Sequence, residues 1–511
     1  MAVFEIVIAL LLGGAILAAI ARRVSLPYPA LVAIAGAALA LFPRVPTLVL
    51  DPELALALFV APVLLDSAFD ASQRDLRKNW RTVAGIAIGA VVLTVVFVAV
   101  VAHALVPGLP WTAAIALGAI VAPPDAAAAT AVLKQLRPPN RLLVILEGES
   151  LFNDASALLI YRFAIAASAA GFASTWSFAA TSVALGAGSI ALALVLARVV
   201  IFISKRIHDV ASAVIFQFCS TFAVWLLADR LHLSAILTMV VFAMAVARPA
   251  AQAIAARVRV PSYAVWEVAV FVLNVLAFIL VGFQLRQIVA RAAWTKYLGV
   301  AAAVCTAVIV ARIVWVSGAA AVSRWRCRLR ANDLETRPDV VALSGRAAAI
   351  VGWCGMRGIV TLAAALALPL SFPYRDLIFF TSFTVVLVTL VVQGITLRPL
   401  LVLLDVRDDG TVEREVQLAR VETLRAALAA VAACGGGESS DLFRRRYELR
   451  LRRAEQHEDE VDPADAAVVR VATDAERQRL IALRENGTIG DAAFQQVEQE
   501  LDIKELVGGQ V

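Results

Sequence analysis

The sequence predicts an all-α membrane protein with about thirteen transmembrane helices and a soluble tail. Of its 511 residues, 61% are hydrophobic and 17% are charged, whereas soluble domains average about 45–50% apolar and about 25% charged residues. The mean hydropathy is +0.83. Apolar stretches of the length that a bilayer requires, about 20 residues, fill most of residues 1–404. These properties indicate one large helical membrane domain.

Thirteen apolar ranges are each near the length of one span. They are residues 3–21, 28–42, 52–72, 82–105, 111–133, 141–168, 172–203, 211–229, 232–248, 263–285, 297–322, 341–370 and 376–404. The first range is followed by Arg22 and Arg23 rather than by a small-residue cleavage site, so we expect a retained span and not a signal peptide.

Two of these ranges contain helix-breaking residues. Pro123 and Pro124 interrupt 111–133, while Gly352, Gly355 and Gly358 loosen 341–370. Paired broken helices in the two halves of a transporter indicate a midplane binding site, because unwound carbonyls and half-helix ends can bind ions. The alternative is a pair of simple kinks whose free backbone groups are satisfied by neighbouring helices.

The basic residues suggest an orientation. Most Lys and Arg residues fall in alternate loops, near positions 22, 74, 134, 205, 248 and 324, and the opposite loops hold fewer, chiefly Arg286, Arg291 and Lys296. By the positive-inside rule, the N-terminus lies outside and the C-terminus in the cytoplasm. We therefore expect a multi-pass protein of the bacterial inner membrane. Because membrane orientation accounts for the basic residues of the loops, we expect no partnership with nucleic acid.

The tail, residues 405–511, differs in composition. It holds 15 Lys and Arg against 23 Asp and Glu, a net charge of −8 against +6 for the whole chain. Helical periodicity over 421–433, the glycines 435–437 and the basic stretch 444–453 predict a small helical cytosolic module. We expect this module to be regulatory. The alternative is a partly disordered solubilising tail.

Several ionisable side chains lie inside the predicted spans. Each costs at least about 2.5–3.5 kcal/mol on insertion scales, so each needs a partner, a water cavity or a function. They are Asp66, Asp125, Glu149, Asp154, Arg312 and Arg357.

Spacing groups four of the residues in one predicted helix. Ser150 and Asp154 are four apart, as are Glu149 and Asn153, so each pair stacks on a helix face and the two faces adjoin. A hydroxyl and a carboxylate on one wall suit a hard cation such as sodium or lithium, and the carboxylate can instead hold a proton. For Glu149 we favour a structural ion pair with Arg312, and for Asp154 a functional role.

The motifs together resemble the cation/proton antiporters, in particular the electroneutral sodium/proton exchanger branch of bacterial type. The strongest likeness is Glu149-Ser-Leu-Phe-Asn153-Asp154, with support from Phe271-Val-Leu-Asn274 through Gly282, Val310-Ala-Arg312, Gly355-Met-Arg357-Gly358 and Thr389-Leu-Val-Val-Gln393-Gly394. The likeness covers residues 1–404 in order, and 484–502 looks similar to the tails of bacterial members.

The resemblance implies a role for each matching residue. Asp154 would bind the cation and the proton, beside Asn153. Ser150 and Asp66 would be further sodium ligands, with the backbone of Pro123 and Pro124 completing the shell. Glu149 and Arg312 would form a structural ion pair, and Asp125 and Arg357 would balance the charges of two crossed, broken helices. The family also implies inverted repeats and a homodimer whose core domain moves against a static domain.

The chain departs from the family's pattern at two positions. Relatives usually carry Thr-Asp-Pro at the first break, where this chain has Pro124-Asp125-Ala126, so a threonine hydroxyl is missing from the expected ion shell. Asp66 stands where many relatives have Glu, which shortens another potential ligand by one methylene group.

We therefore hypothesise a secondary transporter that exchanges sodium or lithium for protons without net charge movement, the two ions competing for Asp154. The alternatives are a potassium/proton antiporter of the same fold and a transport-dead membrane sensor. An intramembrane aspartyl protease using Asp125 and Asp154 lacks the expected Gly-x-Gly-Asp context. The chain has no nucleotide-binding motif and no metal-ligand cluster, so we expect no cofactor; membrane lipid, the cation and the proton are the expected partners.

Overall fold

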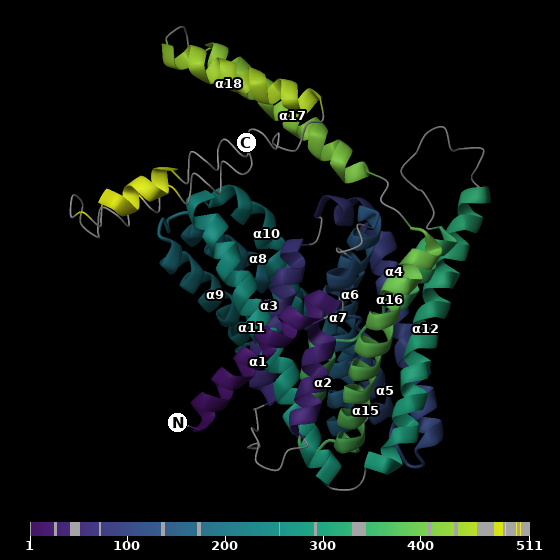
Figure 1. Ribbon diagram of the computed structural model, residues 1–511. Helices are drawn as coiled ribbons and strands as arrows, with labels where there is room; N and C mark the ends of the chain where they lie inside the picture. Colours follow the sequence, from purple (N-terminus) through teal and green to yellow (C-terminus); the bar gives the residue numbers. More distant parts are fainter. Residues whose placement is uncertain are drawn as a thin grey trace. The chain divides into compact units, whose positions relative to one another are not determined.

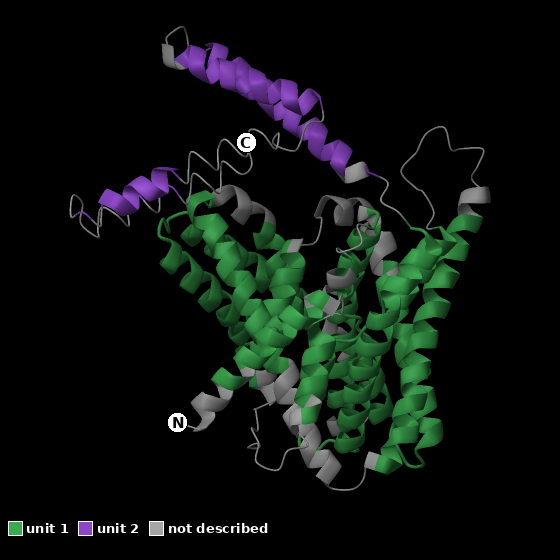
Figure 2. Cartoon of the chain, viewed as in Figure 1, with its two compact units in different colours: residues 1–408 green, residues 409–511 purple. Residues whose placement is uncertain are grey.

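The computed structural model describes residues 2–24, 28–40, 52–70, 73–133, 138–170, 175–254, 256–290, 294–329, 344–406, 410–433, 438–456, 475–483, 486, 497 and 501. All the regular secondary structure in these ranges is helical (Figure 1). The predicted all-α fold class is confirmed. The chain forms two compact units, Met1–Asp408 and Asp409–Val511 (Figure 2).

Every predicted apolar range overlaps a helix or a pair of helices in the first unit. The continuous helices are α1 Ala2–Val24, α2 Tyr28–Ala40, α3 Pro52–Asp70, α4 Gln73–Leu105, α7 Asn140–Ala170, α8 Thr175–Ser204, α9 Val210–Arg230, α10 Ala235–Ala253, α11 Ala256–Ala290 and α12 Trp294–Leu329. Some extend beyond the apolar range: α4 begins at Gln73 rather than at 82, because arginine, lysine and glutamine continue a helix readily.

Three ranges are divided. The range 111–133 forms α5 Trp111–Val121 and α6 Ala126–Leu133, and the range 341–370 forms α13 Gly345–Trp353 and α14 Ile359–Leu366. The last range forms α15 Arg375–Val388 and α16 Gly394–Leu404, joined by a π-helical turn, Thr389–Gln393. Both predicted helix breaks are therefore present, whereas the sequence did not predict the π-helical turn.

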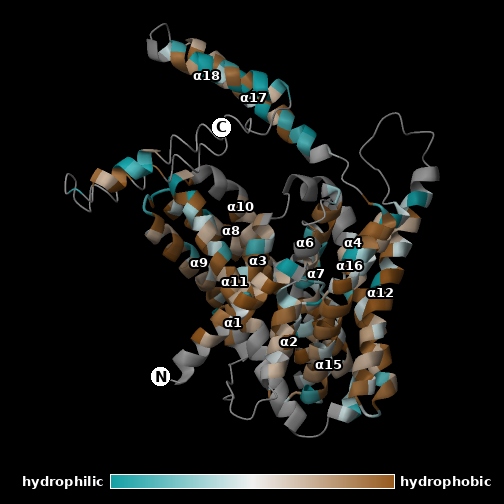
Figure 3. Ribbon diagram, viewed as in Figure 1, coloured by the Kyte–Doolittle hydropathy of each residue, from teal (hydrophilic) through white to brown (hydrophobic). Residues whose placement is uncertain are grey.

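The helices of the first unit consist largely of hydrophobic residues (Figure 3), and many large apolar side chains on them are exposed. On α4, for example, Val92, Val96 and Val100 are about half exposed, at four-residue intervals along one face. Exposed apolar faces of this extent suit contact with lipid rather than with water. Among the described residues, six helical segments are long and apolar enough to cross a membrane: Ala87–Leu105, Ala184–Ser204, Val210–Arg230, Ala256–Ala277, Thr295–Trp325 and Arg375–Leu404.

The half-helix α5 lies in the interior of the first unit. Nine of its eleven residues are buried, and most of them are small. Its Gly118 faces the backbone of α4 so closely that a Cβ atom there would lie 2.8 Å from the carbonyl oxygen of Val95. Small residues permit this close packing of helix backbones in membrane proteins.

The second unit contains a hairpin of α17 Thr411–Ala433 and α18 Glu438–Glu455 (Figure 1). Its helices are joined by a hydrogen bond from Gln417 Nε2 to the carbonyl of Ala454, and the Arg425 guanidinium lies 2.8 Å from both Glu422 and Glu455. Hydrogen bonds to these two carboxylates raise the pKa of Arg425. A further helical stretch covers 475–483.

The close contact of α4 and α5 predicts the effect of a small substitution. Gly118→Ala should lower the melting temperature of the detergent-solubilised protein, because overpacking typically costs about 1–3 kcal/mol. Gly85→Ala on α4 is the matched control, since nothing lies within 4 Å of a Cβ atom built there. Equal melting temperatures for the two variants would contradict the packing described.

Candidate functional site

The two helix breaks meet inside the first unit. The chain is non-helical at 122–125, between α5 and α6, and at 354–358, between α13 and α14. The amide of Asp125 donates a hydrogen bond of 2.6 Å to the carbonyl of Met356. The two unwound segments are therefore in direct contact, although they are more than two hundred positions apart in the chain.

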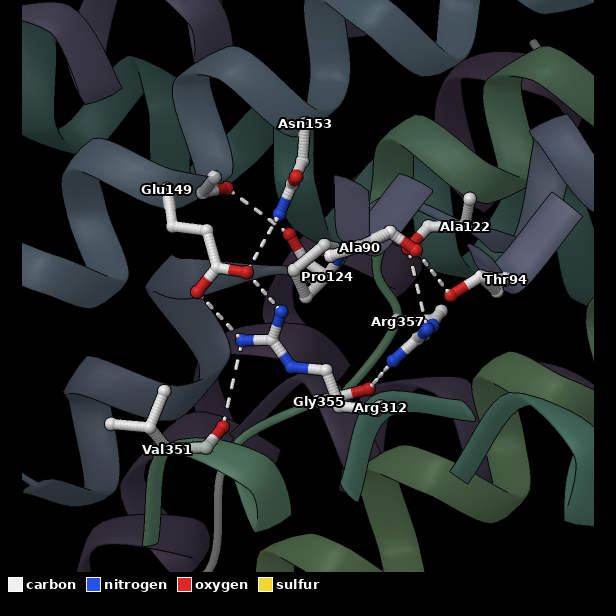
Figure 4. Close-up of polar contacts among 11 residues, drawn as sticks. Ala90, Thr94, Ala122, Pro124, Glu149, Asn153, Arg312, Val351, Gly355 and Arg357 are labelled. Carbon is white, nitrogen blue, oxygen red and sulfur yellow. Dashed lines mark hydrogen bonds and ion pairs between the residues drawn. The ribbon is translucent and has the colours of Figure 1, made fainter. Parts of the chain in front are cut away.

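The side chain of Arg357 is directed at the carboxyl end of α5 (Figure 4). Its Nε donates to the carbonyl of Val121 at 2.9 Å and its second terminal nitrogen to that of Ala122 at 3.3 Å, while the other terminal nitrogen donates to Gly355. The carboxyl end of a helix carries a partial negative charge. A buried guanidinium, 1% exposed, thus meets carbonyls that α5 leaves unpaired.

The Asp125 carboxylate lies at the amino end of α6. Its Oδ1 accepts a hydrogen bond of 3.2 Å from the amide of Ala128, in the manner of a helix N-cap. It also approaches Gly358, the residue before α14, so closely that a Cβ atom there would overlap it. Since amino ends carry partial positive charge, the Asp125 carboxylate lies close to the positive ends of two half-helices.

A cavity lies beside this crossing. It is bounded by α3, α7, α11 and both unwound segments. Its lining residues are Val63, Ser67, Pro123, Pro124, Asp125, Ala126, Ser150, Asp154, Asn274, Gly358, Ile359 and Val360. Four members of the predicted cation-binding set, Ser150, Asp154, Pro123 and Pro124, are thus brought to one space.

Helix α7 contributes the hydroxyl and the carboxylate that line the cavity. Ser150 and Asp154 are both buried, at 6% and 5% exposure, and their four-residue spacing places them on one face of α7. The Ser150 hydroxyl donates a hydrogen bond of 3.1 Å to the carbonyl of Pro124 in the first break. Hydroxyl, carboxylate and carbonyl oxygens are the ligands that hard cations take.

Glu149 and Arg312 form a buried ion pair between α7 and α12 (Figure 4). Both arginine terminal nitrogens contact the carboxylate, one of them at 2.9 Å, and the two side chains are 2% and 3% exposed. The amide nitrogen of Asn153 donates to Glu149 at 3.3 Å. Glu149 therefore holds Asn153 as well as Arg312.

Two predicted ligands, Asp66 and Asn153, are not among the described residues that line the cavity. The carboxylate of Asp66 on α3 accepts a hydrogen bond of 3.1 Å from the indole of Trp266 on α11. Asn153 is fully buried and turned toward Glu149, and its Oδ1 has no hydrogen-bond partner within the part of the chain that the structure describes. Their predicted roles as ligands remain predictions.

Asn274 and Thr389 belong to motifs that support the family resemblance, but the sequence alone predicted no role for either residue. Asn274 on α11 lines the cavity, and its amide donates to the Tyr28 hydroxyl at 3.2 Å. The Thr389 hydroxyl accepts a hydrogen bond of 3.1 Å from the amide of Arg357. Ser67, the neighbour of Asp66, also lines the cavity. Each of these three residues is polar and lies in an apolar span, and this is the only sequence feature that could have indicated a role for it.

The described residues contain no group of three or more His, Cys, Asp or Glu side chains that could hold a metal ion. The cavity instead offers oxygens of three kinds beside one buried aspartate. Such a site can bind a monovalent cation or a proton as a transported substrate.

Residues 6–403 match the family model "Sodium/hydrogen exchanger, transmembrane". An uncharacterized Na+/H+ exchanger from Mycobacterium bovis is 29% identical over 527 residues, which cover 98% of this chain and 95% of that protein. The sodium, potassium, lithium and rubidium/H+ antiporter from Bacillus pumilus is 29% identical over 422 residues, 79% of this chain and 62% of that protein.

A solved structure also matches. The sodium proton antiporter MjNhaP1 from Methanocaldococcus jannaschii aligns with a TM-score of 0.61 and 17% identity, over 76% of this chain and 98% of that one. At this identity the likeness concerns the fold. Together the matches confirm the predicted resemblance.

The ion pair of Glu149 and Arg312 predicts a strongly non-additive double-mutant cycle. Glu149→Gln or Arg312→Met alone leaves a buried charge unpaired and should cost about 3–5 kcal/mol, whereas the double variant removes both charges and should recover much of that loss. Melting temperatures of the four proteins measure this. Additive losses would show that the pair does not couple α7 to α12.

Proposed function

The chain belongs to the sodium/hydrogen exchanger family, and we propose that it exchanges one sodium or lithium ion for one proton across the membrane by alternating access. As a member, it is a multi-pass cation/proton antiporter and a transporter rather than an enzyme. This also removes the aspartyl protease hypothesis. The finer claims, the choice of cation, the stoichiometry and the role of each residue, are our proposal.

The single observation that carries the proposal is the cavity at the helix crossing. There the buried carboxylate of Asp154 and the Ser150 hydroxyl share a space with the backbone of Pro123 and Pro124. Broken helices next to a buried ionisable group are the arrangement expected for a substrate site of a secondary transporter.

Competition at Asp154 supplies the mechanism. When deprotonated, this carboxylate binds a cation, with Ser150 and the carbonyls of the first break as the other oxygen ligands. When the local proton concentration rises, a proton displaces the cation. Either ligand neutralises the site, and a neutral site crosses an apolar barrier at lower cost than a bare carboxylate. The empty, charged site moves slowly, so the two fluxes are coupled.

Exchange without net charge movement follows from counting titrating groups. The neighbour of Asp154 on α7 is Asn153, which cannot titrate and is engaged with Glu149. The other aspartate of the cavity, Asp125, caps α6 and keeps the amino ends of two half-helices compensated. One exchangeable carboxylate therefore remains, which gives one proton for one monovalent cation.

The surrounding charges have structural roles in this proposal. Glu149 and Arg312 hold α7 against α12, and Asp125 and Arg357 balance the half-helix ends at the crossing. Asp66 could join the cation's path only by giving up or sharing its contact with Trp266, so we assign it to a neighbouring state of the transport cycle.

Location and assembly are part of the proposal as well. The charge distribution of the loops supports a bacterial inner-membrane protein with an external N-terminus and a cytoplasmic C-terminus. The family resemblance supports a homodimer. The tail, whose described helices form a unit of their own, would regulate transport rather than carry ions.

Potassium/proton exchange is the second candidate. The Bacillus pumilus relative is named for sodium, potassium, lithium and rubidium, and this chain has Pro124 where relatives usually carry threonine. The loss of one potential ligand changes the number of ligands in the shell, which is one of the properties that set cation selectivity. A transport-dead sensor would bind cations without moving them, so flux measurements distinguish all three functions.

The site assignment predicts the outcome of one substitution. In proteoliposomes with an imposed proton gradient, sodium or lithium should dissipate the gradient for the native chain, and Asp154→Asn should reduce this flux to background because its side chain can hold neither ligand. Asp376→Asn in the first turn of α15, at a residue outside the cavity lining, is a charge-matched control. Full exchange by Asp154→Asn would refute the assignment, and flux with potassium alone would favour the second candidate.

The stoichiometry predicts insensitivity to voltage. Sodium-driven proton flux should stay unchanged when a potassium diffusion potential of either sign is imposed on the proteoliposomes, because no net charge crosses with one cation and one proton. The reference condition is a membrane potential of zero, which a neutral potassium ionophore maintains when the potassium concentration is equal on both sides. A flux that rises with one sign of the potential and falls with the other would require a second proton per cycle.

A further inference from the structure

The exposed face of α18 in the tail has a composition that transport does not explain. Residues at positions 442, 445, 446, 449, 450 and 453 follow the spacing of one helix face. They are Leu442, Arg445, Arg446, Leu449, Arg450 and Arg453. This set, called here the basic face, combines two leucines with four arginines and contains no acidic residue.

The apolar members of this surface project outward. Leu442 is 63% exposed and Leu449 51%, and the adjoining Phe443 is 55% exposed. α18 packs in the hairpin near its carboxyl end, where Ala454 is buried and its carbonyl accepts a hydrogen bond from Gln417 of α17. The exposed leucines of the basic face therefore lie outside the core of the hairpin.

Two of the acidic residues of α18 are paired with arginines outside the basic face. Glu448 lies 3.0 Å from Arg444, and Glu455 lies 2.8 Å from Arg425 of α17. Ion pairs with these carboxylates use Arg444 and Arg425, neither of which belongs to the basic face. Positive charge thus accumulates on the same side of the helix as the exposed leucines, although the tail as a whole is acidic.

We propose that the basic face of α18 binds the surface of an anionic lipid bilayer, with Leu442, Phe443 and Leu449 inserted among the acyl chains. A helix with arginines beside large apolar side chains fits the boundary between headgroups and acyl chains. Negative headgroups complement the four arginines, each of which contributes about 1 kcal/mol near such a surface.

The chain itself favours a bilayer as the occupant over a soluble partner. Only six residues separate the end of α16 at Leu404 from the start of α17 at Thr411, so the tail is tethered to a membrane-spanning unit. Tethering raises the effective concentration of the bilayer at the helix, and weak contacts then suffice. The proposal does not depend on which cation the transmembrane unit carries.

Photo-cross-linking of the full chain in lipid nanodiscs tests the proposal. A benzophenone amino acid replaces Leu442 on the basic face or, as the matched control, Leu418 on α17, since the two leucines are 63% and 64% exposed. We expect lipid adducts at position 442 in nanodiscs that contain phosphatidylglycerol. Adducts should be severalfold fewer in phosphatidylcholine alone, and few at position 418 in either lipid.

Charge variants sharpen the test. Arg445→Gln combined with Arg446→Gln should lower the ratio of bound to free helix about thirtyfold, because two arginines contribute about 1 kcal/mol each and 1.4 kcal/mol is tenfold. Arg414→Gln combined with Arg420→Gln on α17 removes the same charge outside the basic face and should leave the adducts unchanged.

Three outcomes would overturn the proposal. They are equal adduct yields in the two lipids, equal yields at positions 442 and 418, and a cross-link from position 442 to the acidic run of residues 458–462 in place of lipid. The last would identify this chain's own tail as the occupant of the basic face. The readout needs no transport activity, so it stands apart from failure of the proposed exchange.

Discussion

The contact between the two broken helices is the constraint on which the transmembrane unit depends. A helix that stops inside an apolar bundle leaves carbonyls and amides without partners, and each costs several kcal/mol if nothing replaces them. Here Arg357 meets the carbonyls that end α5, the Asp125 carboxylate meets the start of α6, and the Asp125 amide is bonded to Met356. The second break thus supplies a donor for a carbonyl at the first break, and the first break supplies a donor for a carbonyl at the second.

The geometry of the cavity follows from this crossing and from one ion pair. Glu149 and Arg312 join α7 to α12, and the next residue along α7, Ser150, is bonded to Pro124 of the first break. One turn later, Asp154 faces the same space. In our proposal, this buried carboxylate exchanges one positive ligand for another beside the Ser150 hydroxyl and the backbone of the first break.

Much of this could be predicted from the sequence, because the relevant signals are local. Apolar length predicted the spans, proline and glycine predicted the breaks, and four-residue spacing placed Ser150 with Asp154. The hydrogen bond from Trp266 to Asp66 joins residues 200 positions apart, and Glu149, which accepts from Asn153, also accepts from the distant Arg312. Such partners are set by tertiary packing, which no local pattern encodes, and the same holds for Asn274 in the cavity wall.

The central claim is that a cation and a proton compete for one carboxylate. The most direct test counts the protons released when sodium binds to the purified protein. Calorimetry in buffers of different ionisation enthalpy gives this number. The measurements are made above the pH at which sodium binding begins. The account predicts up to one proton released for each sodium bound, with a ratio that falls as the pH rises, and no binding by Asp154→Asn. Sodium binding with no proton release at any pH, or release that persists in Asp154→Asn, would contradict it.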